Sequence, residues 1–171
     1  MDEWVIQVVP FQEDWPARYE AEREQLCQAL KGAAQAIEHI GSTSVRGLDA
    51  KPIIDIAVQL PSVTLVPGLV ERLGQLDYTY EGEFGLSGRH FFVKGEPHAF
   101  HLHLVDNNTH HWRRWIDFRD ALRRDPLLRQ NYQRLKHELA RKYRFQRALY
   151  SEGKSDFING VERNLGVRQE R

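Results

Sequence analysis

The chain has 171 residues, a length that fits one domain with a substantial buried core, so we expect residues 1–171 to form a single domain. Lys and Arg total 24 and Asp and Glu total 24, which leaves a formal net charge of zero. This balance argues against a protein that holds a long nucleic acid or an anionic membrane by bulk charge. The single cysteine, Cys27, excludes an internal disulfide and a cysteine-based zinc site.

Targeting signals are absent from the sequence. The N-terminus lacks the basic and apolar segments of a secretory signal, and no run approaches the roughly 18 apolar residues of a membrane span. We therefore expect a cytoplasmic protein that does not contact a membrane. Hydrophobic residues at 41% and charged residues at 28% indicate a folded core with a hydrated surface. Composition leaves the oligomeric state open.

The first half of the chain predicts an extended segment, a helix and two strands. Residues 5–9 predict a short extended segment, and residues 36–40 and 53–58 predict strands. Asp14, followed by Trp15 and Pro16, predicts a helix start, and Gly32 predicts its stop just after Leu30. On this helix the predicted buried positions are Trp15, Tyr19, Leu26 and Leu30, and the predicted solvent-facing ones are Glu20, Glu22, Arg23 and Glu24.

The second half predicts further strands and then a helical C-terminal third. Residues 64–76 predict a helix, and residues 78–80, 89–94 and 99–105 predict strands. Three helices should follow, with Asn108 capping the first and Asp125-Pro126 dividing it from the second. Residues 151–153 should separate the second helix from the third. The fold class is therefore α+β, with a mixed sheet and flanking helices.

A small-residue turn follows the strand at residues 36–40. Gly41 lets the backbone approach a ligand closely, and Ser42, Thr43 and Ser44 offer hydroxyl and amide donors suited to phosphate oxygens. Such a turn is more often only a turn, and the spacings of a Walker loop and of a dinucleotide-binding fingerprint are both absent. Lys51, in the loop that follows, is either a solvated lysine or a phosphate contact.

Asp55 interrupts a β-branched strand. In an alternating strand Asp55 shares a face with Ile53 and Ala57, while Ile54 and Ile56 take the other face. A carboxylate among apolar neighbours needs a hydrogen bond, an ion pair or a cation, because burying it alone costs several kcal/mol. Metal or substrate contact and a structural ion pair are equally good interpretations.

Two histidines, His101 and His103, share one face of the strand at residues 99–105. Imidazoles two residues apart can bind one zinc, manganese or iron ion. They can equally line a polar groove without metal, an interpretation that the lack of a third ligand in the sequence favours slightly. The adjacent pair His110 and His111 is interpreted as surface capping of a helix start.

Two cationic side chains lie on apolar helix faces. Arg119 follows Trp112 and Trp115 on one stripe, and Lys154 precedes Phe157 and other apolar residues on another. Arg119 must therefore have an anionic partner. Snorkelling or an internal salt bridge is the usual explanation for such cations, and phosphate binding is the more specific one.

Four segments together resemble the GrpB family over nearly the whole chain. They are EHIGSTSV at residues 38–45, GLDAKPIIDI at 47–56, HLH at 101–103 and FRDALR at 118–123, supported by Asp125-Pro126, Tyr132, Leu135-Lys136, Tyr150, Lys154 and Phe157-Ile158. The resemblance implies a fold like that of the DNA polymerase beta-type nucleotidyltransferases. In that superfamily a Gly-Ser turn after one strand holds nucleotide phosphates, and the next strand carries two metal-binding acids.

The resemblance implies a role for each candidate residue, with one departure from the superfamily pattern. Asp55, Ser42 and Lys51 would be catalytic, and Asp55, His101 and His103 would bind a divalent magnesium, manganese or zinc ion. The substrate, a nucleotide or another phosphorylated small molecule, would contact Gly41, Ser42, Thr43, Ser44, Lys51, Arg119 and Lys154. Ala57 occupies the place of the second acid. One aspartate cannot hold the two metal ions of such a centre.

Three functions follow as hypotheses. The first is a metal-dependent nucleotidyltransferase that moves a nucleotidyl group from a nucleoside triphosphate to an acceptor, by positioning and charge stabilisation. The second is an accessory module that binds a nucleotide or phosphate ligand after losing turnover, which Ala57 favours. The third is metal-dependent hydrolysis by water bound at His101 and His103, although further ligands are not evident.

Overall fold

A five-stranded mixed sheet forms the centre of the computed structural model, which describes residues 5–62 and 68–166. The strand order is β1-β2-β5-β4-β3, and among these pairs β2 and β5 are parallel while the others are antiparallel. The strands are β1 (Ala36–Ile40), β2 (Ile54–Leu60), β3 (Tyr78–Tyr80), β4 (His90–Lys94) and β5 (Phe100–Asp106). Sheet and helices together confirm the predicted α+β class.

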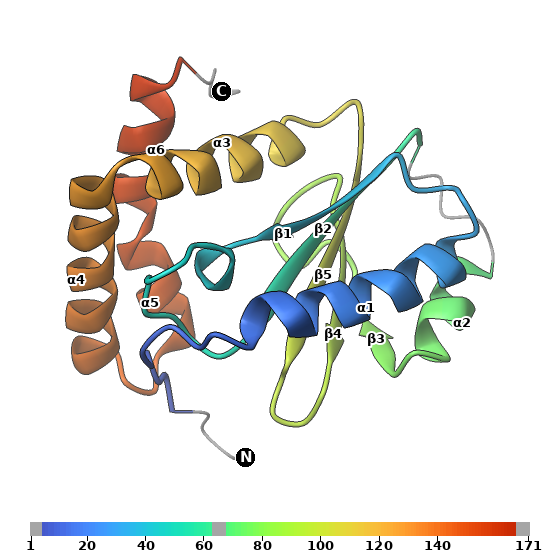
Figure 1. Cartoon of the computed structure of the whole chain (residues 1–171), viewed down its shortest axis with the longest axis horizontal. Helices are drawn as coiled ribbons and strands as arrows, with labels where there is room; N and C mark the ends of the chain where they lie inside the picture. The colour runs from blue at the N-terminus through green and yellow to red at the C-terminus, as the bar shows by residue number, and fades with distance from the viewer. Residues whose placement is uncertain (1–4, 63–67, 167–171) are drawn as a thin grey trace.

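The helices divide into two groups (Figure 1). Helix α1 (Trp15–Leu30) crosses one face of the sheet next to the short α2 (Leu69–Gly74). At the opposite end from α2 lie α3 (His111–Arg124), α4 (Pro126–Lys142), α5 (Arg147–Gly153) and α6 (Ser155–Asn164). In the described part of the chain, none of these helices is long and apolar enough to span a membrane.

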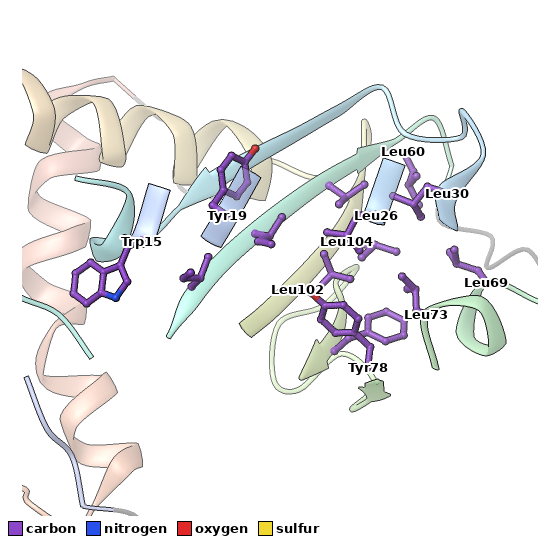
Figure 2. Packing of buried hydrophobic residues seen from close by; sticks show 14 of the residues in the cluster. Trp15, Tyr19, Leu26, Leu30, Leu60, Leu69, Leu73, Tyr78, Leu102 and Leu104 are labelled. Atoms are coloured by element: carbon purple, nitrogen blue, oxygen red, sulfur yellow. The ribbon is translucent and has the colours of Figure 1, made fainter. Parts of the chain in front are cut away.

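The main core fills the space between α1, α2 and one face of the sheet, where Leu26, Leu73, Leu102 and Leu104 are all fully buried (Figure 2). Every second residue of β2 and β5 points into it, because side chains alternate along a strand. Asp55, His101 and His103 therefore face the other way, as the alternation predicts.

A second core holds the C-terminal helices against the loop between β1 and β2. Val45 and Leu48 of that loop pack with Leu122 of α3 and Tyr132 of α4. Asp125 caps α4 as predicted, since its Oδ1 accepts hydrogen bonds from the amides of Leu127 at 2.9 Å and Leu128 at 3.0 Å. This packing places residues of α3, α4 and α5 opposite the polar face of the sheet.

The predicted helix boundaries need correction in the C-terminal third. Residues 151–153 were expected to separate two helices; they form the last turn of α5, and the boundary with α6 follows directly at Lys154. A further break at residues 143–146, which was not expected, divides α4 from α5, so four helices follow β5 in the described residues instead of three. Gly153, the last residue of α5, also packs closely, because a Cβ there would lie 2.5 Å from Leu139 Cδ2. Helix α3 begins at His111, and Asn108 does not cap it, because the Asn108 amide donates to Asp106 Oδ1 in a local turn.

Two further predictions for the N-terminal half change. Glu22 of α1, expected in solvent, is 4% exposed and accepts a hydrogen bond from Lys94 Nζ at 2.9 Å. The helix expected at residues 64–76 is shorter as α2, and residues 64–67 of that prediction lie outside the described residues. Of the extended segment at residues 5–9, the structure has one bridge, between Val9 and Ala50.

Candidate functional site

A cavity of about 370 Å³ lies between the polar face of the sheet and the C-terminal helices. Its wall contains one carboxylate, Asp55, and five cationic side chains, which are Lys51, Arg89, Lys136, Arg147 and Lys154. Of the residues singled out from sequence, it brings together Gly41, Ser42, Thr43, Lys51, Asp55, His101, His103 and Lys154. A cavity with this balance of charge is suited to an anion.

The parallel pairing of β2 with β5 puts Asp55 beside the two histidines. Asp55 is in register with His101, and Ala57 with His103, so that both imidazoles flank the carboxylate on one face. His103 Nε2 lies 3.1 Å from Asp55 Oδ1, and His101 Nδ1 lies 3.4 Å from the same oxygen. The short side chain of Ala57 leaves room for His103 to reach across to Asp55.

Arg89 sets the protonation of His103. A guanidinium can only donate, and Arg89 Nη1 lies 3.3 Å from His103 Nδ1, so Nδ1 accepts and the ring proton sits on Nε2, facing Asp55. Burial lowers the pKa of His103, which agrees with a neutral ring. Burial alone would raise the pKa of Asp55, but the hydrogen bonds from His101 and His103 outweigh it and hold this pKa far below its ordinary value. Asp55 is therefore an ionised carboxylate at neutral pH.

Gly41 closes against Asp55 from the end of β1. Its φ of 70° is in the region that favours glycine, and a Cβ at this position would lie 2.7 Å from Asp55 Oδ2. Both the backbone conformation and the available space therefore require glycine here. Ser42 and Thr43 continue the turn along the cavity wall, where Thr43 Oγ1 lies 2.9 Å from His39 Nε2.

The side chains of three of the five cations have no hydrogen bond or ion pair with any described residue. They are Lys51, Arg147 and Lys154, and the two ammonium groups lie over the ring of Tyr150 at 5.4 and 4.6 Å from its centroid. Burial lowers the pKa of Lys51 to about 8, helped by repulsion from Lys154 and Arg147. Burial also lowers the pKa of Lys154 to about 8, against the attraction of Asp55. A bound anion would relieve this repulsion.

Lys136 has a structural partner. Its side chain is 2% exposed, and its Nζ donates a short hydrogen bond to the carbonyl oxygen of Asp49. Burial, with repulsion from Lys154, lowers its pKa to about 7. Lys136 therefore holds the loop between β1 and β2 and adds positive charge to the cavity wall.

Two residues predicted to bind substrate lie outside the cavity. Arg119 is 8% exposed and bonds to Glu38 Oε2 at 2.7 Å and to Asp120 Oδ1 at 2.9 Å, so its predicted anionic partner is confirmed. These bonds, with one to the carbonyl of His39 at 3.0 Å, use Nε and Nη1 of the guanidinium and fasten α3 to β1. Ser44 Oγ donates to the carbonyl of Gly41 at 2.5 Å and so stabilises the turn.

The fit of a metal ion is poor in the arrangement described. Among residues 5–62 and 68–166, no group of three or more His, Cys, Asp or Glu side chains is placed to hold a metal. The nitrogen of His103 that faces Asp55 carries a proton, and moving it to Nδ1 would set it against Arg89. A divalent ion on Asp55, His101 and His103 stays a prediction, to be tested by metal analysis of the purified protein.

Sequence reasoning missed Arg89, Arg147 and Tyr150 as parts of the cavity. Arg89 lies two residues before Phe91, and this spacing indicates that both line one face of a strand. It does not indicate which strand they would pair with. Tyr150 and Lys154 are four residues apart, but the sequence was interpreted as a helix break at residues 151–153, between them, so this helical spacing was not recognised. These residues come together only through tertiary packing.

Comparison with known proteins identifies the family. The model of the family described as GrpB protein matches residues 5–164. The chain belongs to the GrpB family. A GrpB crystal structure from Enterococcus faecalis is similar, with a TM-score of 0.86 and 37% sequence identity, covering 92% of this chain and 96% of the other.

Two curated relatives of this GrpB chain are longer. It is 32% identical over 160 residues to the UPF0157 protein YqkA of Bacillus subtilis, covering 93% of this chain and 47% of YqkA. It is 39% identical over 161 residues to the UPF0157 protein PA4798 of Pseudomonas aeruginosa, covering 90% of this chain and 64% of the relative. The chain therefore spans about half to two thirds of the length of these two proteins.

Proposed function

We propose that this GrpB protein binds a phosphorylated small molecule in the cavity, with the phosphate held by Lys51, Arg147 and Lys154. One observation carries the proposal, namely that these three cations line one cavity and that their side chains have no hydrogen bond or ion pair with a described residue. Clustered cations without anionic partners repel one another, so they favour a ligand with more than one negative charge.

The distribution of charge also orients the ligand. The cations without protein partners come from the loop before β2 and from the helical side, whereas the carboxylate of Asp55 lies on the sheet. Asp55 repels phosphate, so the phosphate lies toward Tyr150 and the uncharged part of the ligand lies toward Asp55 and its two histidines.

Calorimetric titration with inorganic pyrophosphate at pH 7 tests this proposal. Lys51→Met and Lys154→Met should each weaken binding by about tenfold, because each removes a charge-assisted contact while keeping the length of the side chain. Lys142→Met is the matched control, since Lys142 also lies over a tyrosine ring, that of Tyr143 at 5.0 Å, but outside the cavity. Equal weakening by all three variants, or no binding to the wild type, would contradict the proposal.

Nucleotidyl transfer is the second candidate function. What favours it is the contact between the turn at Gly41 and the lone acid Asp55, the pairing that the resemblance to nucleotidyltransferases implies. In this reaction an acceptor hydroxyl oxygen bonds to the α phosphorus, the bond to the β-phosphate oxygen breaks, and pyrophosphate leaves. The hydroxyl proton passes to solvent, because Asp55 with its low pKa is a weak base. Lys51 and Lys154 would neutralise the departing pyrophosphate.

Incubation with α-labelled nucleoside triphosphates, with magnesium or manganese, tests for transfer. Label on an acceptor, lost in Asp55→Asn, would support catalysis. If nucleotide binds without transfer and Asp55→Ala leaves affinity unchanged, the protein is an accessory binding module instead. Ala57, in the place of a second acid, favours that outcome.

A further inference from the structure

One exposed aromatic ring stands at the wall of the cavity, in the loop between β3 and β4. Phe84 is 62% exposed, yet it lines the same cavity as Lys51 and Lys154. Large apolar side chains that stay in solvent beside a binding cavity are candidates for ligand contact. The ring of Phe84 is therefore available to a molecule bound there.

The loop holds Phe84 in a fixed and strained position. Its φ is 47°, a backbone conformation that phenylalanine rarely adopts. Arg89 donates hydrogen bonds to the carbonyl oxygens of Glu83 at 3.1 Å and Phe84 at 2.8 Å, and Glu83 Oε1 accepts from the amide of Gly88 at 2.7 Å. The exposure of Phe84 is thus imposed by its own loop.

From Phe84 the cavity wall continues through aromatic side chains to the two histidines beside Asp55. The centroid of Phe84 lies 5.3 Å from that of Phe91, and Phe91 lies 5.1 Å from each of His101 and His103. The cavity therefore has an aromatic wall on β4, β5 and the loop before β4, and a cationic wall formed by Lys51 in the loop before β2 and by Arg147 and Lys154 on the helical side. A ligand that satisfies both carries a flat ring and a phosphate.

We infer that Phe84 is a stacking platform for a planar ring in the phosphorylated ligand. This inference rests on the proposed function, because it assigns the non-phosphate half of the same molecule. The ring of the ligand stacks on the exposed side of Phe84, while its phosphate contacts Lys51, Arg147 and Lys154. Arg89 is a positioning residue, since it fixes the loop through backbone carbonyls.

The test compares methyl phosphate with phenyl phosphate and adenosine 5′-monophosphate in calorimetric titrations of the whole chain. A ring-bearing ester should bind about tenfold more tightly than methyl phosphate, the gain typical of stacking on an aromatic side chain. Phe84→Asn should remove that gain and leave the affinity for methyl phosphate unchanged, and Phe84→Trp should keep it. Equal affinities for all three esters, or a preference that survives Phe84→Asn, would overturn the inference.

Stability provides a second readout. Asparagine tolerates a positive φ better than phenylalanine, so Phe84→Asn should unfold at the same or a higher temperature while it loses ring binding. Phe145→Asn is the matched control, because Phe145 is 50% exposed and lies outside the cavity, and it should leave every affinity unchanged. A lowered unfolding temperature together with weaker methyl phosphate binding would show a structural role and contradict the platform. Failure of all three esters to bind would instead reject the proposed function and this inference with it.

Discussion

The two faces of the central sheet are built from the same strands but differ in character: one is apolar and packed, and the other is polar and borders the cavity. On the face toward α1, Ile56 and Leu102 are fully buried among apolar side chains. On the other face, Asp55 and His103 are hydrogen-bonded to each other, while the side chains of Lys51 and Lys154 contact the ring of Tyr150 but have no hydrogen bond or ion pair with a described residue. The apolar face is filled by the protein's own side chains, whereas the polar face borders a cavity lined by charged groups, which separates the residues expected to stabilise the fold from those proposed to bind a ligand.

The largest expected effect is on the apolar face. Leu102→Ala should lower the free energy of unfolding by about 2–5 kcal/mol, because a fully buried leucine leaves a cavity. Urea denaturation measures this loss. Asp55→Asn, one strand away on the polar face, should cost much less, since the amide can still accept from one imidazole. If Asp55→Asn costs as much as Leu102→Ala, the polar face is as important for stability as the core.

A smaller effect is expected at Gly41, which lies beside Asp55 on the polar face. Gly41→Ala should cost about 1–3 kcal/mol, through its positive φ and through a Cβ placed 2.7 Å from Asp55 Oδ2. Gly47→Ala is the matched control, because φ there is 76° but nothing lies within 4 Å of the added Cβ. The excess cost of Gly41→Ala should vanish in the Asp55→Ala background, as measured by a double-mutant cycle. If Gly41→Ala still costs more than Gly47→Ala in the Asp55→Ala background, the strain does not come from the contact with Asp55.

The smallest effect concerns the charge of the cavity and depends on pH. The pKa of Lys154 falls from 10.5 to about 8 on folding, so the charged lysine destabilises the protein at pH 7 and the penalty fades as pH rises from about 8 to 10.5. Lys154→Met should therefore raise the free energy of unfolding at pH 7 by roughly 1 kcal/mol, and by less at pH 10. Thermal unfolding at both values measures this. In the wild type, deprotonation of Lys154 should weaken sulfate binding as the pH rises from 7 to 9. Sulfate suits this measurement because its own charge does not change over that range.

Much of the fold was predictable because strands alternate with a period of two. The burial of Ile54 and Ile56, and the shared face of His101 and His103, follow directly from that period and are confirmed. The anionic partner of Arg119 was predictable because a guanidinium on an apolar helix face needs one. Which acid it would choose was not, since Glu38 is 81 residues away in the chain.

The cationic wall of the cavity could be predicted only in part. Lys51 and Lys154 stood out locally, but Arg147 and Arg89 carry no local signal that they converge on the same space. Their meeting depends on how α5 packs over the sheet and on the pairing of β4 with β5, which itself pairs with β2, and such long-range packing is not encoded in spacing along one segment. The same reason explains why Arg119, equally prominent in sequence, lies outside the cavity.

Because β5 pairs directly with β2, the hairpin formed by β3 and β4 attaches at the outer edge of the sheet. The loop of this hairpin, at residues 81–89, borders the cavity but takes no part in the register that sets Asp55 beside His101. Insertions or exchanges at its tip that keep Arg89 would reshape the rim while leaving the carboxylate and its imidazoles in place, because Arg89 is the residue of this loop that contacts His103. Chains with different loop tips would then differ in ligand preference around an unchanged centre.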